Sequence, residues 1–239
     1  MKTVLITGGA RRLGRALVEH FAQQGWQVLF TCQWSFEEGT ALAESLGAHV
    51  HCLRTAVSSQ RSASMIAGWA QGYTAELDLL ICNASTFMKT SVESVTPDEF
   101  GDLLESNLLG PFFLIQQCLS LLRAAQGSVV NIADAQATGG VAEFAPYVAT
   151  KAGLISITKT LAIELAPQVR INAVLPGTLP WPENPSIYSH AAKEKTLAEI
   201  PMATAGSWHA VVQAVSYLDA AKYVTGICMP VDGGRSARF

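Results

Sequence analysis

The sequence predicts an α/β fold, in which one doubly wound parallel sheet of about seven strands has helices on both faces. Short β-branched or apolar runs alternate regularly with longer helical patterns along the chain. Several runs are apolar throughout, as expected for strands that are covered on both sides. The 239 residues are 49% hydrophobic and contain no repeat or linker, so residues 1–239 are expected to form a single domain.

The expected elements follow in chain order. The strands are Thr3–Thr7, Gln27–Cys32, Ala48–Arg54, Leu77–Cys82, Ser128–Ala133, Arg170–Leu175 and Ile227–Val231. The clearest helical patterns are Gly14–Gln24, Thr96–Arg123 and Pro146–Ala166. Because strands and helices alternate, we expect right-handed crossovers between neighbouring parallel strands.

Composition and charge narrow the classes of partner. A formal net charge of −3 gives no electrostatic case for nucleic acid or an anionic membrane. No apolar run approaches the roughly 20 residues of a membrane span, and the start MKTVLITGG has too short an apolar stretch for a signal peptide. Five cysteines without a CxxC pair indicate reduced thiols, so a cytoplasmic location is expected. His49 and His51 have no evident third partner, so no metal site is expected.

A glycine-containing turn, TGGARRLG, follows the apolar run Val4–Ile6 and precedes a helical pattern. Strand, turn and helix in this order place the pyrophosphate of a dinucleotide on a helix N-terminus, as in Rossmann-like folds. Gly8 permits the turn, and Gly14 lets the helix approach the sheet closely. Arg12 stands where a strict GxGxxG has glycine, so the turn alone is a weak signal.

Tyr147 and Lys151 stand four residues apart within a helical pattern, so they share one helix face. A nearby ammonium favours phenolate and is expected to bring the tyrosine pKa down from about 10. Tyr147 could then exchange a proton with a substrate. The alternative is an ordinary surface pair on a helix.

Further motifs follow the strands in order: Asn83-Ala84-Ser85, Asn107, Asp134 and Pro176-Gly177-Thr178. Together with TGGARRLG and YVATK, they make the sequence resemble the short-chain dehydrogenase/reductase family over essentially its whole length. The resemblance implies that Lys151 also holds the nicotinamide ribose and that Asn107 supports a proton-relay water. It further implies a homotetramer, formed through the two long helices and the last strand.

The same resemblance implies a set of cofactor-binding residues around the strand ends. They are Gly8, Arg11, Arg12, Leu13, Gly14, Gln33, Trp34, Ser35, Val57, Asn83, Ala84, Ser85, Tyr147, Lys151, Pro176, Gly177 and Thr178. The second strand is followed by no acid until Glu37, while Ser35 and Arg11 could donate to a 2′-phosphate, so we predict NADPH rather than NADH. Ala56 replaces the aspartate usual near adenine, which leaves the backbone at Val57 to bind the ring.

Asp134 stands where most of this family carries a serine that binds the substrate carbonyl. A carboxylate repels a carbonyl oxygen unless it is protonated, so a plain ketone fits poorly. An aspartate suits a substrate with N–H groups, or with a ring nitrogen that must be protonated. The alternative is that Ser128 or Thr138 takes the serine's place and that Asp134 is a solvated loop residue.

One subgroup, the pteridine reductases with the related dihydromonapterin reductases, combines these departures. The sequence resembles it in GGARRLG, NASTF, Asp134 and the ending DGGRSARF. The substrate-binding residues implied are Arg12, Ser85, Phe87, Asp134 and Tyr147. Arg12 would bridge pyrophosphate and pterin, and Phe87 would stack the flat ring against the nicotinamide. For Phe87 the alternative is ordinary core packing.

We therefore predict an NADPH-dependent reductase of a 7,8-dihydropterin, such as dihydromonapterin or dihydrobiopterin, with dihydrofolate as a further candidate. Asp134, Tyr147, Lys151 and Asn107 are the expected catalytic set. One alternative is a short-chain carbonyl or 3-oxoacyl reductase acting on a ketone or an acyl thioester. A second alternative is a catalytically silent NADPH-binding regulator.

Two segments are expected to complete the pocket. Leu179–Pro201, with Trp181 and Tyr188, falls where the family places its substrate loop, and Trp208 follows a little beyond it. In pteridine reductases the chain end reaches a neighbouring subunit's active site, so the arginines of Asp232–Phe239 could bring a cation to Asp134. The alternative is a frayed basic tail.

Overall fold

The computed structural model describes residues 1–181 and 189–238 and contains one seven-stranded sheet. The strands are β1 (Thr3–Ile6), β2 (Gln27–Cys32), β3 (Val50–Arg54), β4 (Leu79–Cys82), β5 (Ser128–Ile132), β6 (Arg170–Pro176) and β7 (Cys228–Val231). They lie in the order β3-β2-β1-β4-β5-β6-β7, and every neighbouring pair is parallel. All seven expected strands are confirmed, with ends that differ by at most two residues, and the doubly wound Rossmann-like fold is confirmed with them.

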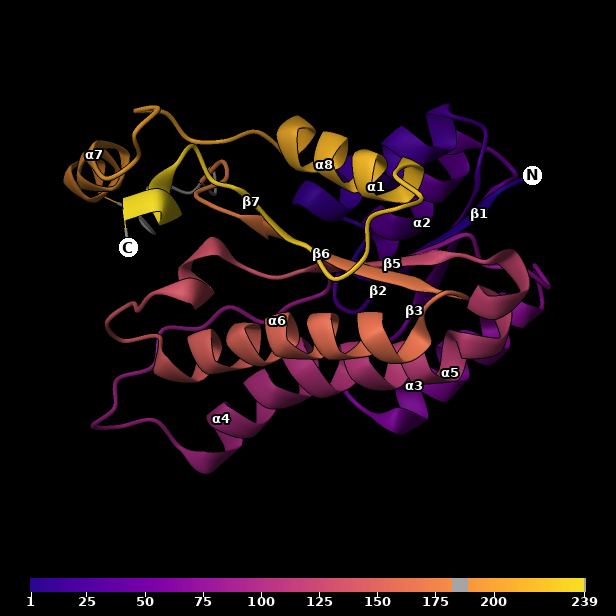
Figure 1. Ribbon diagram of the computed structural model, residues 1–239, viewed down its shortest axis with the longest axis horizontal. Helices are drawn as coiled ribbons and strands as arrows, with labels where there is room; N and C mark the ends of the chain where they lie inside the picture. The colour runs from indigo at the N-terminus through magenta and orange to yellow at the C-terminus, as the bar shows by residue number, and fades with distance from the viewer. Residues whose placement is uncertain (182–188, 239) are drawn as a thin grey trace.

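Helices cover both faces of this sheet (Figure 1). They are α1 (Arg12–Gln23), α2 (Phe36–Leu46), α3 (Gln60–Gln71), α4 (Pro97–Leu104), α5 (Gly110–Ala125), α6 (Ala145–Leu165), α7 (His190–Ala198) and α8 (Trp208–Ala220). α1, α2 and α8 lie on one face, and α3, α5 and α6 on the other. α7 lies away from the sheet, beside the C-terminal turn η3 (Arg235–Arg238).

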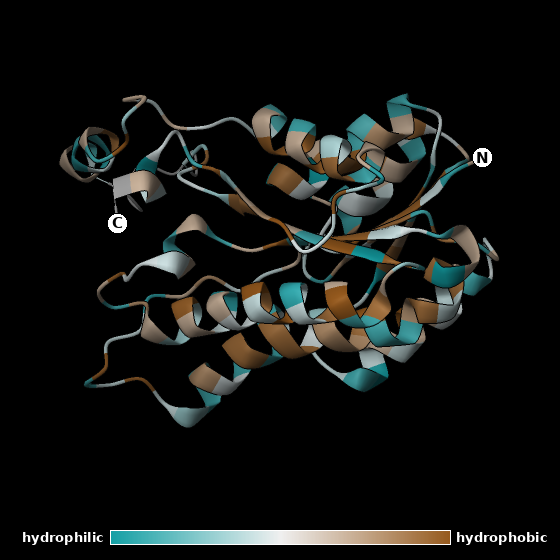
Figure 2. Ribbon diagram, in the orientation of Figure 1, coloured by the Kyte–Doolittle hydropathy of each residue, from teal (hydrophilic) through white to brown (hydrophobic). Residues whose placement is uncertain are grey.

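Alternate residues of the strands supply the two cores. Val4 and Ile6 of β1 point into the core beneath α1 and α8, whereas Leu5 between them points into the core beneath α3 and α5. Figure 2 shows apolar colouring along the strands and on the helix surfaces that face them. Burial on both faces explains why these strands are continuous apolar runs in the sequence.

The expected helix Thr96–Arg123 is interrupted in the structure. α4 and α5 are separated by a π turn, η1 (Glu105–Leu109), which buries Asn107 completely. Single π turns within α-helices occur frequently at functional sites. A continuous apolar pattern could not reveal the extra residue in this turn.

One helical span, Pro97–Ala125, is long and apolar enough by composition to cross a membrane, with a mean hydropathy of 1.4 in its most apolar part. The span packs against α3 and α6 in the helical layer of the domain (Figure 1). Its apolar residues, including Leu114, Cys118 and Leu122, are part of the core on that face of the sheet.

Gly14 is the point at which α1 approaches the turn that follows β1. A Cβ placed on Gly14 would lie 1.9 Å from the carbonyl oxygen of Gly8, which cannot move without opening the turn. Gly14→Ala is therefore expected to lower the free energy of unfolding by about 1–3 kcal/mol, measured by denaturant titration.

Gly68 supplies the matched control, because it is an exposed glycine in α3 and nothing lies within 4 Å of a Cβ placed on it. Gly68→Ala should raise stability by about 0.5–1 kcal/mol, since alanine favours the helix over glycine. A similar loss in both variants would show that the close approach at Gly14 is unimportant.

Candidate active site

A cavity of about 1200 Å³ opens at the carboxyl ends of the strands, across the point between β1 and β4 where the strand order reverses. Open α/β sheets bind ligands in this position. All residues predicted to bind cofactor or substrate line the cavity: Gly8, Arg11, Arg12, Leu13, Gly14, Gln33, Trp34, Ser35, Val57, Asn83, Ala84, Ser85, Phe87, Asp134, Tyr147, Lys151, Pro176, Gly177 and Thr178. Asn107, the remaining predicted site residue, does not line the cavity but is hydrogen-bonded to Ser85 and Thr86, which do.

The glycine turn is fastened to the end of β4. Asn83 Nδ2 donates to the carbonyl oxygens of Thr7 and Gly8, at 2.9 and 3.1 Å, and Thr7 Oγ1 accepts from the backbone N–H of Asn83 and of Ala84. No side chain caps the N-terminus of α1. The first N–H groups of α1 therefore have no side-chain acceptor, and Arg12, Leu13 and Gly14 of this turn line the cavity, an arrangement that fits the pyrophosphate of a dinucleotide.

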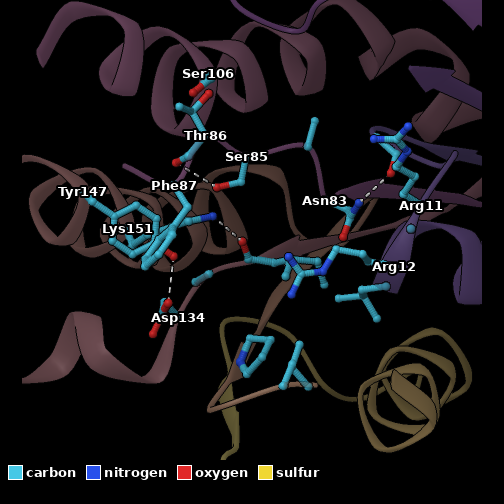
Figure 3. A pocket seen from close by; sticks show the side chains of 18 of the residues that line it. Arg11, Arg12, Asn83, Ser85, Thr86, Phe87, Ser106, Asp134, Tyr147 and Lys151 are labelled. Carbon is cyan, nitrogen blue, oxygen red and sulfur yellow. Dashed lines mark hydrogen bonds between the residues drawn. The ribbon is translucent and has the colours of Figure 1, made fainter. Parts of the chain in front are cut away.

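Arg12 adopts a left-handed backbone conformation, with φ of 52°, at the position where the strict motif has glycine. Its Nη2 donates to the carbonyl oxygen of Pro180 at 3.1 Å, and its guanidinium lies 5.4 Å from the ring centroid of Trp208. Arg12 thus spans the cavity from the glycine turn to the segment after β6. Figure 3 shows Arg12 and Arg11 pointing in different directions.

Arg11 is paired with Glu38 of α2 through two hydrogen bonds. The sequence after β2 has no acid before Glu37, and Arg11 was expected to be available to a 2′-phosphate, but the Glu38 carboxylate already binds it. Glu38 lies in the first turn of α2, so it reaches back to the glycine turn although it is 27 residues away along the chain. Ser35, at the N-cap of α2, lines the cavity and its side chain makes no capping bond.

Tyr147 and Lys151 lie on the buried face of α6, as their spacing predicts. The Lys151 ammonium donates to the carbonyl oxygen of Ile132 at 2.9 Å and lies 5.9 Å from the centre of the Tyr147 ring. Complete burial lowers the pKa of Lys151 to about 8, although Asp134 and Cys82 act in the opposite direction.

Asp134 joins this pair at the end of β5. Its Oδ2 accepts a hydrogen bond from the Tyr147 hydroxyl at 2.7 Å (Figure 3). Its Oδ1 accepts from the backbone N–H of Gln136 at 2.8 Å. Burial raises the pKa of Asp134, while Tyr147, Gln136, Lys151 and Arg235 oppose that rise.

The expectation that Lys151 lowers the tyrosine pKa is wrong for this structure. Burial, and then the adjacent Asp134 carboxylate, raise the pKa of Tyr147 well above its ordinary value. The phenol is therefore neutral and donates its proton to the hydrogen bond with Asp134. The sequence showed Lys151 four residues from the tyrosine, but it could not show that the carboxylate is the nearer charge.

Neither Ser128 nor Thr138, the two alternatives for the position of the family's serine, lines the cavity. Ser128 lies at the opposite end of β5, where its hydroxyl donates to Asp219 at 3.4 Å. Thr138 donates to the carbonyl oxygen of Ala135 at 2.8 Å. The residue that faces Tyr147 is therefore the carboxylate.

The side chain of Asn107 is held by hydrogen bonds to neighbouring residues. Its Oδ1 accepts from Ser85, Ser106 and the backbone N–H of Thr86, and its Nδ2 donates to the carbonyl oxygen of Thr86 and to Thr150. These bonds fix the segment after β4 against α6. Asn107 touches neither Tyr147 nor Lys151 through a hydrogen bond, so its support of a proton-relay water stays a prediction.

Residues 8–236 match the family model described as enoyl-(acyl carrier protein) reductase. The chain belongs to the short-chain dehydrogenase/reductase family. The match includes the glycine turn, the tyrosine–lysine pair and the segment after β6.

Two curated relatives and one solved structure illustrate the range of this likeness. The chain is 30% identical over 240 residues to a 3-oxoacyl-[acyl-carrier-protein] reductase of Staphylococcus aureus, covering 98% of this chain and 97% of the relative. It is 30% identical to the enzyme of the same name from Escherichia coli, with coverages of 98% and 96%. A glucose/ribitol dehydrogenase structure from Brucella melitensis superposes with a TM-score of 0.91 at 28% identity, covering 98% of this chain and 96% of that one.

The relatives' names bear on the choice among the predicted functions. They confirm an oxidoreductase of the short-chain dehydrogenase/reductase family. They fit the 3-oxoacyl reductase alternative better than the pterin hypothesis, which neither curated name carries.

Phe144 is a wall residue of this short-chain dehydrogenase/reductase that the sequence analysis missed. Its ring stacks on Phe87 with centroids 4.8 Å apart and planes 19° apart, and Phe87 also meets Tyr147 edge-on at 4.9 Å. The backbone N–H of Thr90 bonds the carbonyl oxygen of Glu143 at 2.7 Å, which holds the two segments together. The sequence feature that could have indicated this role is the position of Phe144, an aromatic residue three positions before Tyr147.

The substrate segment is described in part. Trp181 and Trp208 line the cavity, as does Arg235 near the chain end. Tyr188 and the rest of residues 182–188 lie outside the described residues, as does Phe239. A reach of the chain end into a neighbouring subunit stays a prediction, whereas Arg235 is found in the cavity of its own chain.

Lys151 yields a pH prediction. With a pKa of about 8, it loses its proton as the pH rises through that value. We expect kcat/KM for the nicotinamide cofactor, which reports the free enzyme, to fall by about tenfold per pH unit above this point. Lys151→Arg keeps a positive charge at every accessible pH, so its profile should lack the fall even if its rate is lower. An identical fall in both proteins would assign it to another group.

Proposed function

We propose that the chain is an NADPH-dependent reductase of a 7,8-dihydropterin, such as dihydromonapterin or dihydrobiopterin. The observation that carries the proposal is the 2.7 Å hydrogen bond from the Tyr147 hydroxyl to the Asp134 carboxylate at the cavity wall. A carboxylate at this place accepts hydrogen bonds and repels a carbonyl oxygen. A pterin ring carries N–H groups that can donate to it, which is the reason for placing this substrate class first.

The protein's part in the reaction is to hold and deliver a proton. A bound nicotinamide cofactor would supply the hydride for ring C6. Tyr147, a neutral phenol, holds the proton that the ring N5 requires, and its hydroxyl would turn from Asp134 to N5 when it gives that proton up. One hydride and one proton together saturate the C6–N5 bond. Lys151 supplies a positive charge near the carboxylate at pH values below about 8.

Three further residues would position the ring. Phe87 and Phe144 form an aromatic wall beside Tyr147, against which a planar heterocycle can stack. Arg12 extends into the cavity with its backbone held in the left-handed region, and it would contact both a cofactor phosphate and the pterin. Ser85, beside the nicotinamide position implied by the family, would bind both ligands.

The relatives' names favour a second candidate, reduction of a 3-oxoacyl thioester or another small ketone. For such a substrate Asp134 would have to be protonated in order to donate to the carbonyl oxygen. Burial raises its pKa in that direction, but the positive charges of Lys151 and Arg235 oppose this. Asp134 is thus the residue that separates the two candidates.

A spectrophotometric NADPH oxidation assay tests the choice, with dihydromonapterin, dihydrobiopterin, dihydrofolate, a 3-oxoacyl thioester and small ketones as substrates. We expect turnover of a dihydropterin, and we expect Tyr147→Phe to lower it by about 100-fold or more. Asp134→Ser should impair pterin reduction and improve ketone reduction. Preferential turnover of the thioester by the wild-type protein would reject the pterin proposal in favour of the second candidate.

We also propose a preference for NADPH, supported by Arg11 and Ser35 at the end of the cavity beyond β2. The two cofactors differ only in the 2′-phosphate, so Arg11→Ala should lower the preference for NADPH by about tenfold, the scale of a hydrogen bond to a charged group. Glu38→Gln should raise the preference, because Glu38 competes with the phosphate for Arg11. Ratios of kcat/KM for the two cofactors measure both effects, and unchanged ratios would exclude Arg11 from this role.

A further inference from the structure

The C-terminal segment after β7 is folded back by its own side chains. The Asp232 carboxylate accepts hydrogen bonds from the backbone N–H of Gly234 at 2.9 Å and of Ser236 at 2.7 Å. Gly233 and Gly234 have φ of 66° and 86°, values that favour glycine. The DGGRS sequence therefore forms a closed turn that leads directly into η3.

This turn is pressed against the chain that follows α7. A Cβ on Gly233 would lie 2.7 Å from Ile200 Cγ2, and a Cβ on Gly234 would lie 3.2 Å from Pro201 Cγ. The backbone N–H of Met202 donates to the carbonyl oxygen of Gly233 at 3.2 Å. The close packing sets the direction in which the next side chain, that of Arg235, leaves the backbone.

Arg235 lines the cavity, and its side chain is only 14% exposed. Its Nη1 donates to Thr178 Oγ1 at 3.2 Å, and its Nη2 is paired with Glu199, which follows the last turn of α7. Its Nε is buried and has no acceptor among the described residues. One guanidinium thus connects the segment after β6 with the end of α7, where it pairs with the half-exposed carboxylate of Glu199.

The turn that carries this guanidinium lies against the turn that carries Asp134. η3 packs against η2 (Ala135–Thr138), the turn that Asp134 caps. Arg235 lowers the pKa of Asp134 against the effect of burial, which raises it. The other groups that face Asp134 in the described part of the chain are Tyr147 and Lys151 from α6 and the backbone N–H of Gln136.

We propose that Arg235 is a positioning residue of its own chain's active site. It clamps the end of α7 to the cavity through Glu199 and Thr178, and, together with Lys151, it adds a positive charge that favours the anionic form of Asp134. The position of the end of α7 and the charge state of the acceptor are thereby coupled through one side chain. The proposal rests on the role proposed for Asp134 and does not depend on which substrate is reduced.

Three variants separate the electrostatic effect from the clamp. Arg235→Gln removes the charge, Arg235→Lys keeps the charge but loses the fork that reaches two partners, and Glu199→Gln breaks the clamp while leaving the cation in place. The measurements are kcat and KM as functions of pH, with whichever substrate the wild-type protein reduces. A carboxyl ¹³C NMR titration of Asp134, assigned with Asp134→Asn, needs no substrate.

Arg235→Gln should move the acid limb of kcat/KM and the Asp134 titration to higher pH by on the order of one unit, because a neighbouring cation no longer favours the carboxylate. Arg235→Lys should keep both near the wild-type pH. Glu199→Gln should leave both at the wild-type pH or lower and should raise KM. Thermal unfolding identifies any variant that fails to fold. If Arg235→Gln is such a variant, the pH profiles of Arg235→Lys and Glu199→Gln are compared with that of the wild-type protein instead.

Some results would overturn the proposal. If Arg235→Gln raises KM or lowers stability while the Asp134 titration stays in place, Arg235 has a structural role only. If Glu199→Gln leaves KM unchanged, there is no clamp. A shifted titration in a protein that reduces no pterin would support the role of Arg235 and reject the proposed substrate, so the two failures can be told apart.

Discussion

The parallel direction of all seven strands is the constraint on which the site depends. Parallel strands place their carboxyl ends along one edge of the sheet, and the reversal between β1 and β4 leaves a crevice there. The glycine turn after β1, Asn83 after β4, Asp134 after β5 and Gly177 after β6 meet at this crevice although they are far apart in the sequence. α6 then lies beside β5 and presents Tyr147 and Lys151 to the same space.

Burial determines how these groups share their protons. In a region largely shielded from water, charge is costly, so the pKa of Lys151 falls and those of Asp134 and Tyr147 rise. The result is a neutral phenol directed by a carboxylate, with two cations near it. One fold can serve many substrates, so the proposed substrate class depends on particular side chains of the cavity, and Asp134 is the first of them.

The fold could be predicted closely from the sequence, because apolar strands alternating with helical patterns admit few arrangements. The residues that line the cavity could be predicted equally well, since motifs that follow parallel strands must meet at one edge of the sheet. The contacts between distant segments could not be predicted. The pairing of Arg11 with Glu38, the stacking of Phe87 on Phe144 and the place of Arg235 depend on how loops fold back on one another, and no periodicity records that. The homotetramer and the cytoplasmic location stay predictions.

By itself, the sequence determined that the sheet is parallel and doubly wound and that a glycine turn follows the first strand. It also determined that Tyr147 and Lys151 share one helix face and that an aspartate stands where the family usually has a serine. These are local facts, set by spacing and residue type. The tertiary structure alone decided that Tyr147 donates to Asp134 and does not ionise beside Lys151. It also decided that Arg235 of the same chain stands near that carboxylate. Both depend on distances and burial in three dimensions, because the strength of a charge interaction depends on separation and on the exclusion of water.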